Sequence, residues 1–219
     1  MVQIINLGHQ DSIFNQYIAE IRDADIQLDR MRFRRNLERM GEVMAYEISK
    51  TLEYEEIEVD TQLGAKMVRV PAEQPVIATI LRAGLPFHAG FLNVFDKADS
   101  GFIAAYRKYD KNEDFEIKVE YHSAPDLEDK TLILCDPMLA TGESFHKTLN
   151  GLLNEENTPK HIHIAVAIAS AEGVEYVKRV FSSMPMTLWV GAIDDELTAR
   201  AYIVPGLGDA GDLAFGEKH

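Results

Sequence analysis

Cysteine is almost absent from this chain, with Cys135 as the single example among 219 residues. One thiol excludes an internal disulfide framework and any zinc site built from several thiolates. Because Cys135 lies inside the apolar run TLILC, we interpret it as a small buried hydrophobic residue rather than as a nucleophile.

Long apolar runs are missing as well. No stretch approaches the roughly 18 consecutive apolar residues that a membrane-spanning helix needs. The N-terminus, MVQIINLGHQ, lacks the basic and apolar regions of a signal peptide. We therefore expect a cytoplasmic protein with no membrane partner.

Basic residues are few relative to acidic ones. The chain has 22 Lys and Arg against 36 Asp and Glu, a formal net charge of −14. This balance argues against the broad basic surface that non-specific nucleic-acid binding requires, so we expect no nucleic-acid partner. The acidic net charge is still compatible with a small polyanionic ligand, because the binding site for such a ligand needs only a few arginines close together.

Internal repeats, low-complexity segments and linkers rich in proline and serine are also absent. A chain of 219 residues with 46% hydrophobic residues is long enough for one sizeable core and too short for two comfortable domains. We predict a single domain over residues 1–219.

The first third of the chain predicts a helix followed by a hairpin. Residues 28–48 carry apolar side chains at intervals of about 3.6 residues, as expected for an amphipathic helix. Its arginines lie mostly elsewhere on the helix, which indicates a solvated or subunit-facing basic side, with RNA contact as the alternative. The next segment, YEEIEVDTQLGAKMVRVP, alternates around a glycine turn. It predicts a hairpin arm at about residues 50–73 that reaches across a subunit contact.

From residue 75 the pattern becomes that of an α/β protein. Short runs rich in branched residues alternate with helical patterns: PVIATIL, GFIAAY, TLILCD, HIHIAVAIAS and MTLWVGAI are the expected strands. They predict a mostly parallel, twisted sheet flanked by helices. Ligands of such sheets bind beyond the carboxyl ends of the strands, so the residues just after each strand are the candidates for function.

Two polar groups near these strands have simple structural interpretations. His161 and His163 alternate along one strand and share a face, but no third metal ligand is near them in the sequence. We interpret them as polar residues at the start of a strand. The acidic run 194–196 follows MTLWVGAI and is read either as a cation site or as an acidic helix start or solvated turn.

The segment after TLILC is the most informative in the chain. It contains Asp136, Pro137, Met138, Leu139, Ala140, Thr141, Gly142, Glu143 and Ser144, and a predicted helix follows. Proline ends the strand and glycine permits a tight path, so the backbone amides of 141–144 can converge on an anion at a helix N-terminus. A carboxylate at the strand tip suits sugar hydroxyls. The pattern indicates a phosphorylated sugar, and a helix start capped by Thr141 or Ser144 is the alternative.

The stretch ILCDPMLATGES at 133–144 resembles the donor-binding loop of type I phosphoribosyltransferases, and its Asp-Pro-Met-Leu-Ala-Thr-Gly form is similar to that of the uracil phosphoribosyltransferase family. Three further matches to that family are ILRAGL at 80–85, AYR at 105–107 and YIVPGLGDAGD at 202–212, followed by FGEK. The resemblance covers about residues 28–218. It implies a type I phosphoribosyltransferase fold with an N-terminal helix, a hairpin arm and a small C-terminal hood over the base.

The resemblance also implies a role for each motif. The loop 136–144 would bind 5-phospho-α-D-ribose 1-diphosphate (PRPP), with Arg82 and Arg107 on its phosphates. The C-terminal segment, about 194–219, would bind uracil through the backbone of Ile203 and of Gly208, Asp209 and Ala210. Asp209 would also lie near the donor and the reacting nitrogen, where it either assists deprotonation of uracil or positions it.

The implied activity is pyrimidine salvage: uracil and PRPP give UMP and diphosphate. Arg82, Arg107 and Mg²⁺ would neutralise the leaving group. The Mg²⁺ ion would be held mainly by substrate and water, with no assigned protein ligand. The resemblance leaves open GTP as an effector, and the hairpin and basic helix favour a homodimer or a higher homo-oligomer.

Two points separate this interpretation from an alternative on the same fold. A pyrimidine nucleotide-sensing, RNA-binding regulator would resemble the family, but it would carry two acids at the start of the loop and lack the GLGDAGD ending.

Glu143 departs from the family pattern, since it stands where a second glycine is usual. We expect its side chain to face away from the phosphate.

Overall fold

The computed structural model describes residues 1–109, 115–155 and 157–217, with only the backbone described at 105–109 and 115–122. Its centre is an eight-stranded sheet that is parallel except for its last pair. The strands follow the order β1-β10-β9-β7-β4-β5-β6, and β8 pairs with β9. Their bounds are β1 (Gln3–Asn6), β4 (Val76–Leu81), β5 (Ser100–Tyr109), β6 (Phe115–Ser123), β7 (Thr131–Cys135), β8 (Met138–Leu139), β9 (His161–Ser170) and β10 (Met186–Asp194).

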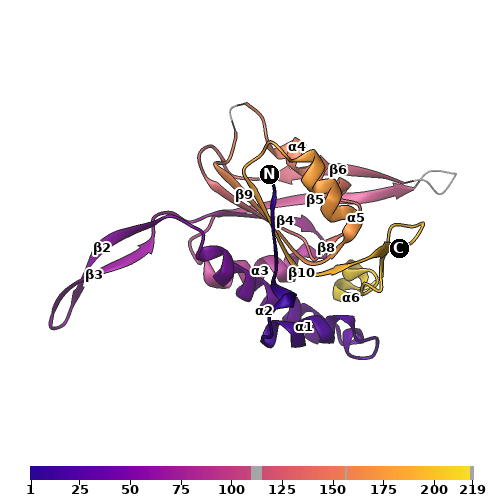
Figure 1. Ribbon diagram of the computed structural model, residues 1–219, viewed down its shortest axis with the longest axis horizontal. Helices are drawn as coiled ribbons and strands as arrows, with labels where there is room; N and C mark the ends of the chain where they lie inside the picture. Colours follow the sequence, from indigo (N-terminus) through magenta and orange to yellow (C-terminus); the bar gives the residue numbers. More distant parts are fainter. Residues whose placement is uncertain (110–114, 156, 218–219) are drawn as a thin grey trace.

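Helices cover both faces of this sheet (Figure 1). One face carries α1 (Ile13–Arg22), α2 (Arg30–Ser49) and α3 (Gly84–Val94), and the other carries α4 (Glu143–Leu152) and α5 (Ala171–Val180). Successive strand residues face opposite sides, so the apolar runs divide between two cores. In β7, for example, Ile133 packs with α2 and α3, while Leu132 and Leu134 pack with α4 and α5.

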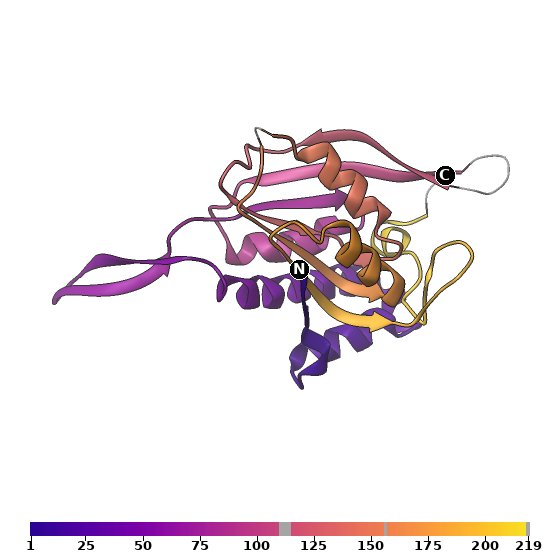
Figure 2. The same cartoon turned by 45° about the horizontal axis from the view of Figure 1, so that its top comes forward.

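The predicted hairpin is present as β2 (Tyr54–Thr61) and β3 (Gly64–Pro71), which form a separate antiparallel ribbon. The ribbon projects away from the sheet and helices in both views (Figures 1 and 2). Every residue of β2 is exposed. Its role as a contact between subunits stays a prediction.

The C-terminal segment folds back over the carboxyl edge of the sheet. It contains β11 (Glu196–Leu197) paired with β12 (Ile203–Val204), and then α6 (Ala210–Phe215). Arg34 on α2 donates a hydrogen bond of 2.7 Å to the carbonyl of Ala214, which fixes the end of α6 on α2.

The two histidines of β9 have structural partners. Trp189 Nε1 donates to His163 Nδ1 at 3.1 Å, and His161 Nε2 lies 3.0 Å from the hydroxyl of Thr187. Burial lowers the pKa of His163 to about 3, with a smaller contribution from the neighbouring His161. These contacts account for the polar start of β9 without a metal ion.

Candidate active site

Parallel strands bring residues from distant parts of the sequence to one edge of the sheet. Arg82 follows β4, Asp136 follows β7, Ser170 ends β9 and Asp194 ends β10. The parallel pairing of β4 with β7, β7 with β9 and β9 with β10 places all four at neighbouring strand ends. This is the edge where the sequence predicted the site.

The loop that follows β7 is held by its own backbone and by β9. Asp136 Oδ1 accepts a hydrogen bond from the amide of Met138 at 3.0 Å, which turns the chain directly after the strand. The carbonyl of Pro137 accepts from the amides of Ala167 and Ile168 at 3.1 and 2.9 Å. Both contacts fix the first half of the loop against the sheet.

Gly142 turns the second half of the loop into α4. It has a φ angle of 85°, and a Cβ at this position would lie 2.7 Å from the ring of Tyr176 on α5. Gly142 is the N-cap of α4, and the neighbouring Thr141 Oγ1 accepts a hydrogen bond from the amide of Glu143 at 3.4 Å. The alternative of a helix start capped by Thr141 is therefore partly supported, and the N-terminus of α4 also suits an anion.

Ser170 ties the loop to the start of α5. Its buried hydroxyl donates to the carbonyl of Ala140 at 2.6 Å and accepts from the amide of Gly173 at 2.8 Å. The link to Ala140 depends on the pairing of β8 with β9, which local sequence does not specify.

Arg82 lies at a cis peptide bond after β4 and faces the C-terminal helix. Its Nη2 donates to Asp212 Oδ1 and to the carbonyl of Gly216, both at 3.2 Å. Its Nε is buried and has no hydrogen-bond partner within the described part of the chain. The Arg82 side chain is 38% exposed, and a guanidinium at the strand edge suits an incoming oxyanion.

Arg107 lies on β5 in register with Ile117 of β6. Its side chain falls outside the part of the structure that is described. Its contact with the donor therefore stays a prediction.

Asp209 begins α6 and is fixed by the backbone that follows it. Its Oδ1 accepts from the amides of Gly211 and Asp212 at 2.8 and 3.0 Å. A Cβ on Gly211 would lie 3.8 Å from Arg82 Nη2, so the start of α6 is beside the arginine. The structure thus brings together Arg82 and the segment predicted to bind the base.

The predicted base-contacting residues surround a bend between β12 and α6. Ile203 and Ala210 are buried, with 4% and 3% of their surface exposed. Gly208 has a φ angle of 94°, and no heavy atom lies within 4 Å of a Cβ built on it. The backbone at Gly208 is therefore open to close approach by a flat ring.

Most arginines of α2 are engaged within the chain. Arg32 pairs with Glu20 at 3.1 Å, Arg35 pairs with Glu38 at 2.6 Å, and Arg39 donates to Asn36 at 3.2 Å. The hydrogen bond from Asn36, followed by those from Gln16 and Arg32, lowers the pKa of Glu20. A basic face reserved for RNA is not supported by these contacts.

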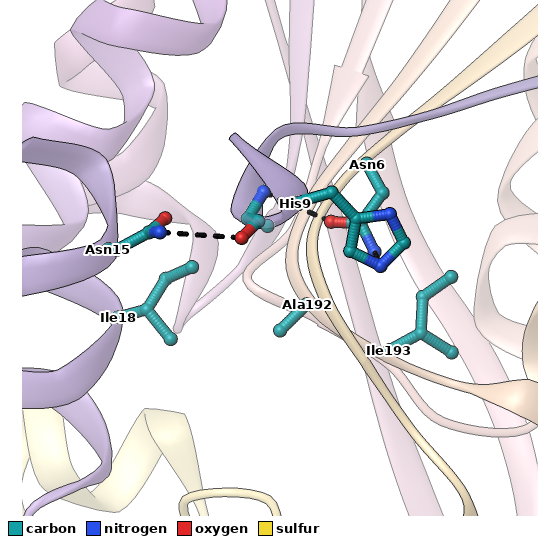
Figure 3. Close-up of a pocket in the computed structure, with 8 residues that line it drawn as sticks. Asn6, His9, Asn15, Ile18, Ala192 and Ile193 are labelled. Atoms are coloured by element: carbon teal, nitrogen blue, oxygen red, sulfur yellow. Dashed lines mark hydrogen bonds between the residues drawn. The ribbon is translucent and has the colours of Figure 1, made fainter. Parts of the chain in front are cut away.

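A pocket of about 230 Å³ lies between α1 and the end of β10 (Figure 3). Asn15 and Ile18 of α1 form one wall, and the other walls come from His9 and from residues 191–193. Asn15 Nδ2 donates to the carbonyls of Gly8 and Gln10 at 3.4 and 3.2 Å. None of the predicted site residues lines this pocket.

The parallel sheet, the phosphate-type loop after β7 and the arginine after β4 define the class: the fold is that of the type I phosphoribosyltransferases. The family model described as uracil phosphoribosyltransferase matches residues 9–217. The chain belongs to the uracil phosphoribosyltransferase family.

Individual relatives agree with this assignment. The uracil phosphoribosyltransferase of Porphyromonas gingivalis is 52% identical over 217 residues, covering 99% of this chain and 100% of the relative. That of Sulfolobus acidocaldarius is 38% identical, covering 93% and 96%. The solved structure of the AQ2163 protein from Aquifex aeolicus is 30% identical, covers 98% of both chains and superposes with a TM-score of 0.86. Within residues 1–109, 115–155 and 157–217, no helix is long and apolar enough to cross a membrane.

Proposed function

We propose that this protein is a pyrimidine salvage enzyme that converts uracil and PRPP to UMP and diphosphate. The observation that carries the proposal is the convergence of the loop 136–144, Arg82 and the segment 203–210 at one edge of the sheet. Family membership and the names of the relatives support the same reaction.

The loop and the arginines have separate tasks in this reaction. The amides of the first turn of α4 bind the 5′-phosphate, and Asp136 accepts hydrogen bonds from the ribose hydroxyls. When diphosphate departs, positive charge develops on the anomeric carbon and negative charge on the leaving oxygens. Arg82 and Arg107 stabilise the leaving group, and most of the rate comes from positioning and charge neutralisation.

Mg²⁺ is the proposed cofactor, and the residues present fit it. Over the described residues, no group of three or more His, Cys, Asp or Glu is arranged to hold a metal ion, while single carboxylates such as Asp136 and Asp209 border the site. Isolated oxygen donors suit an ion that keeps substrate oxygens and water in an octahedral shell. When bound, Mg²⁺ would neutralise charge on the diphosphate.

Uracil is read by the backbone at Ile203, Gly208, Asp209 and Ala210. A ring with alternating C=O and N–H groups suits main-chain donors and acceptors at an open glycine. Asp209 already caps α6 through Oδ1. Its carboxylate can therefore hold the segment in place, and assistance in deprotonating uracil is the second role to be tested.

Subunit association and effectors are the remaining parts of the proposal. The exposed ribbon β2–β3 supports a homodimer or a larger assembly in which the arm packs on a second copy of the chain. GTP is the effector to test first, by comparing turnover with and without it.

Conversion of labelled uracil to UMP tests the proposed function. The complete mixture of enzyme, PRPP and Mg²⁺ should form UMP, and omission of PRPP should abolish it. Arg82→Ala should lower kcat by roughly 100-fold, the usual effect of removing one donor to a developing oxyanion. Absence of UMP together with salt-dependent RNA binding would replace the proposal with the regulator.

A further inference from the structure

Gly206 lies two residues before the open backbone at Gly208, and both of its main-chain polar groups are held by other parts of the chain. Its amide donates to Asp194 Oδ2 at 2.9 Å, and its carbonyl accepts from Arg22 Nη1 at 2.9 Å. Its φ angle is 54°, and a Cβ would lie 2.2 Å from the carbonyl oxygen of Ile203. The turn into the base-contacting segment is therefore tightly constrained.

Arg22 and Asp194 form a two-bond ion pair. Arg22 Nη1 lies 2.8 Å from Asp194 Oδ2, and Nη2 lies 2.7 Å from Oδ1. The side chain of Asp194 is 8% exposed and that of Arg22 is 22% exposed. Paired, charge-assisted hydrogen bonds in a mostly buried setting fix orientation as well as distance. The sequence interpretations of 194–196 as a cation site or a solvated turn are thus wrong for Asp194.

The ion pair joins α1 to β10, two elements with a pocket between them. Arg22 is the last residue of α1, and Asp194 is the last residue of β10. The pocket of Figure 3 lies between α1 and residues 191–193 of β10. The ion pair therefore joins these elements at the edge of the site, in addition to the packing of Phe14 near Gly191.

The next residue of the turn has a similar link to the N-terminal part of the chain. With its amide nitrogen facing the two carbonyls, Gln27 donates to Leu207 at 2.9 Å and to Ile21 at 3.1 Å. Residues 206 and 207 are thus both held from the segment 22–27. The donor loop has different supports, namely the backbone of β9 and the hydroxyl of Ser170.

We propose that Arg22 and Asp194 are positioning residues for the base, acting through the backbone of Gly206. The inference rests on the proposed function, since it assigns the segment 203–210 to uracil. Arg22 and Asp194 act on the placement of uracil rather than of PRPP, because their contacts end on the turn before Gly208.

Steady-state kinetics of Arg22→Gln, Arg22→Lys and Asp194→Asn test this inference. Arg22→Gln should raise KM for uracil by at least roughly tenfold, because small displacements of a binding surface carry large costs, and leave KM for PRPP within about twofold. Arg22→Lys retains the charge but loses the paired geometry, so its KM should fall between wild type and Arg22→Gln. Asp194→Asn keeps an acceptor for Gly206 and should also raise KM for uracil.

Arg32→Gln is the matched control. It removes the ion pair of Arg32 with Glu20, which joins α2 to α1 rather than to the turn at 206. Both KM values should stay within about twofold of wild type. If Arg22→Gln does not fold, Arg22→Lys and Asp194→Asn decide the question.

Equal rises in both KM values, or no rise for uracil in folded variants, would overturn the inference and leave the ion pair a structural contact. Amide hydrogen exchange of the peptide 203–210 gives a second readout that needs no turnover. Exchange should accelerate in Asp194→Asn and Arg22→Lys and not in Arg32→Gln. If the wild-type protein makes no UMP but Asp194→Asn and Arg22→Lys still exchange faster than wild type, the mechanical link holds and the proposed function fails. Unchanged exchange in these two variants would contradict the link itself.

Discussion

Gly142 and Gly151 lie at opposite ends of α4 and have very different surroundings. Gly142 has a φ angle of 85° and faces the ring of Tyr176, whereas a Cβ on Gly151 meets no heavy atom within 4 Å. Gly142→Ala should distort the loop and raise KM for PRPP by roughly tenfold or more, because a left-handed backbone and a close contact oppose the side chain. Gly151→Ala should leave KM unchanged. Equal kinetics in the two variants would contradict the role given to the loop.

His163 makes stability depend on pH. Its pKa is about 3 in the folded protein and about 6.5 in an unfolded chain, so the unfolded state binds more protons between these values. Stability should therefore fall as pH drops below about 6.5, with a slope from this residue of up to about 1.4 kcal/mol per pH unit. Denaturant unfolding of wild type and His163→Asn from pH 7 to 5 measures this slope. Identical slopes would show that His163 is not the titrating group.

Local sequence predicts the chemistry of single residues better than their partners. The loop at 136–144 follows from proline, glycine and hydroxyl residues next to one another. Arg22 and Asp194 could not be paired in the same way, because 172 positions separate them and each alone is an ordinary surface residue type. Only the fold brings α1 to the end of β10.

Among the elements, most of those with a clear period were predicted, and several without one were missed. The helix predicted at 28–48 is α2 (Arg30–Ser49), and the five expected strands are present. Helix α3 has an almost uniformly apolar sequence, GLPFHAGFLNV, and is buried on several sides, so no helical stripe is visible. The four-residue strand β1 is too short to establish a period, and α1 and β6 were also missed.

The hairpin arm offers a prediction at the scale of an element. Its register pairs Ile57 with Val68 on one face and Glu56 with Arg69 on the other. The first face has an exposed apolar centre of Ile57, Val59 and Val68, flanked by Glu55 and Lys66. We expect wild type to be a dimer or larger, and Ile57→Glu combined with Val68→Glu to dissociate it, because the charges would be buried in the contact. Glu56→Gln is the control on the opposite face. Light scattering after size exclusion measures each mass, and a monomeric wild type would contradict the prediction.

At the scale of the whole molecule, three distant segments meet around Arg82. The turn after β4 supplies the arginine, α6 supplies Asp212 and its C-cap Gly216, and α2 holds the end of α6 through Arg34. The net charge of −14 is compatible with an anionic substrate because the cations are focused rather than numerous. The proposed reaction requires the loop 136–144 and the C-terminal segment to act on the same pair of substrates.

Diphosphate release with PRPP and Mg²⁺ tests this central claim most directly, with uracil, cytosine, orotate and hypoxanthine supplied one at a time. We predict turnover with uracil alone, because the backbone at 203–210 reads one base while the loop binds the common donor. Turnover with another base instead would contradict the assignment of 203–210, and no release with any of the four would contradict the proposed enzyme.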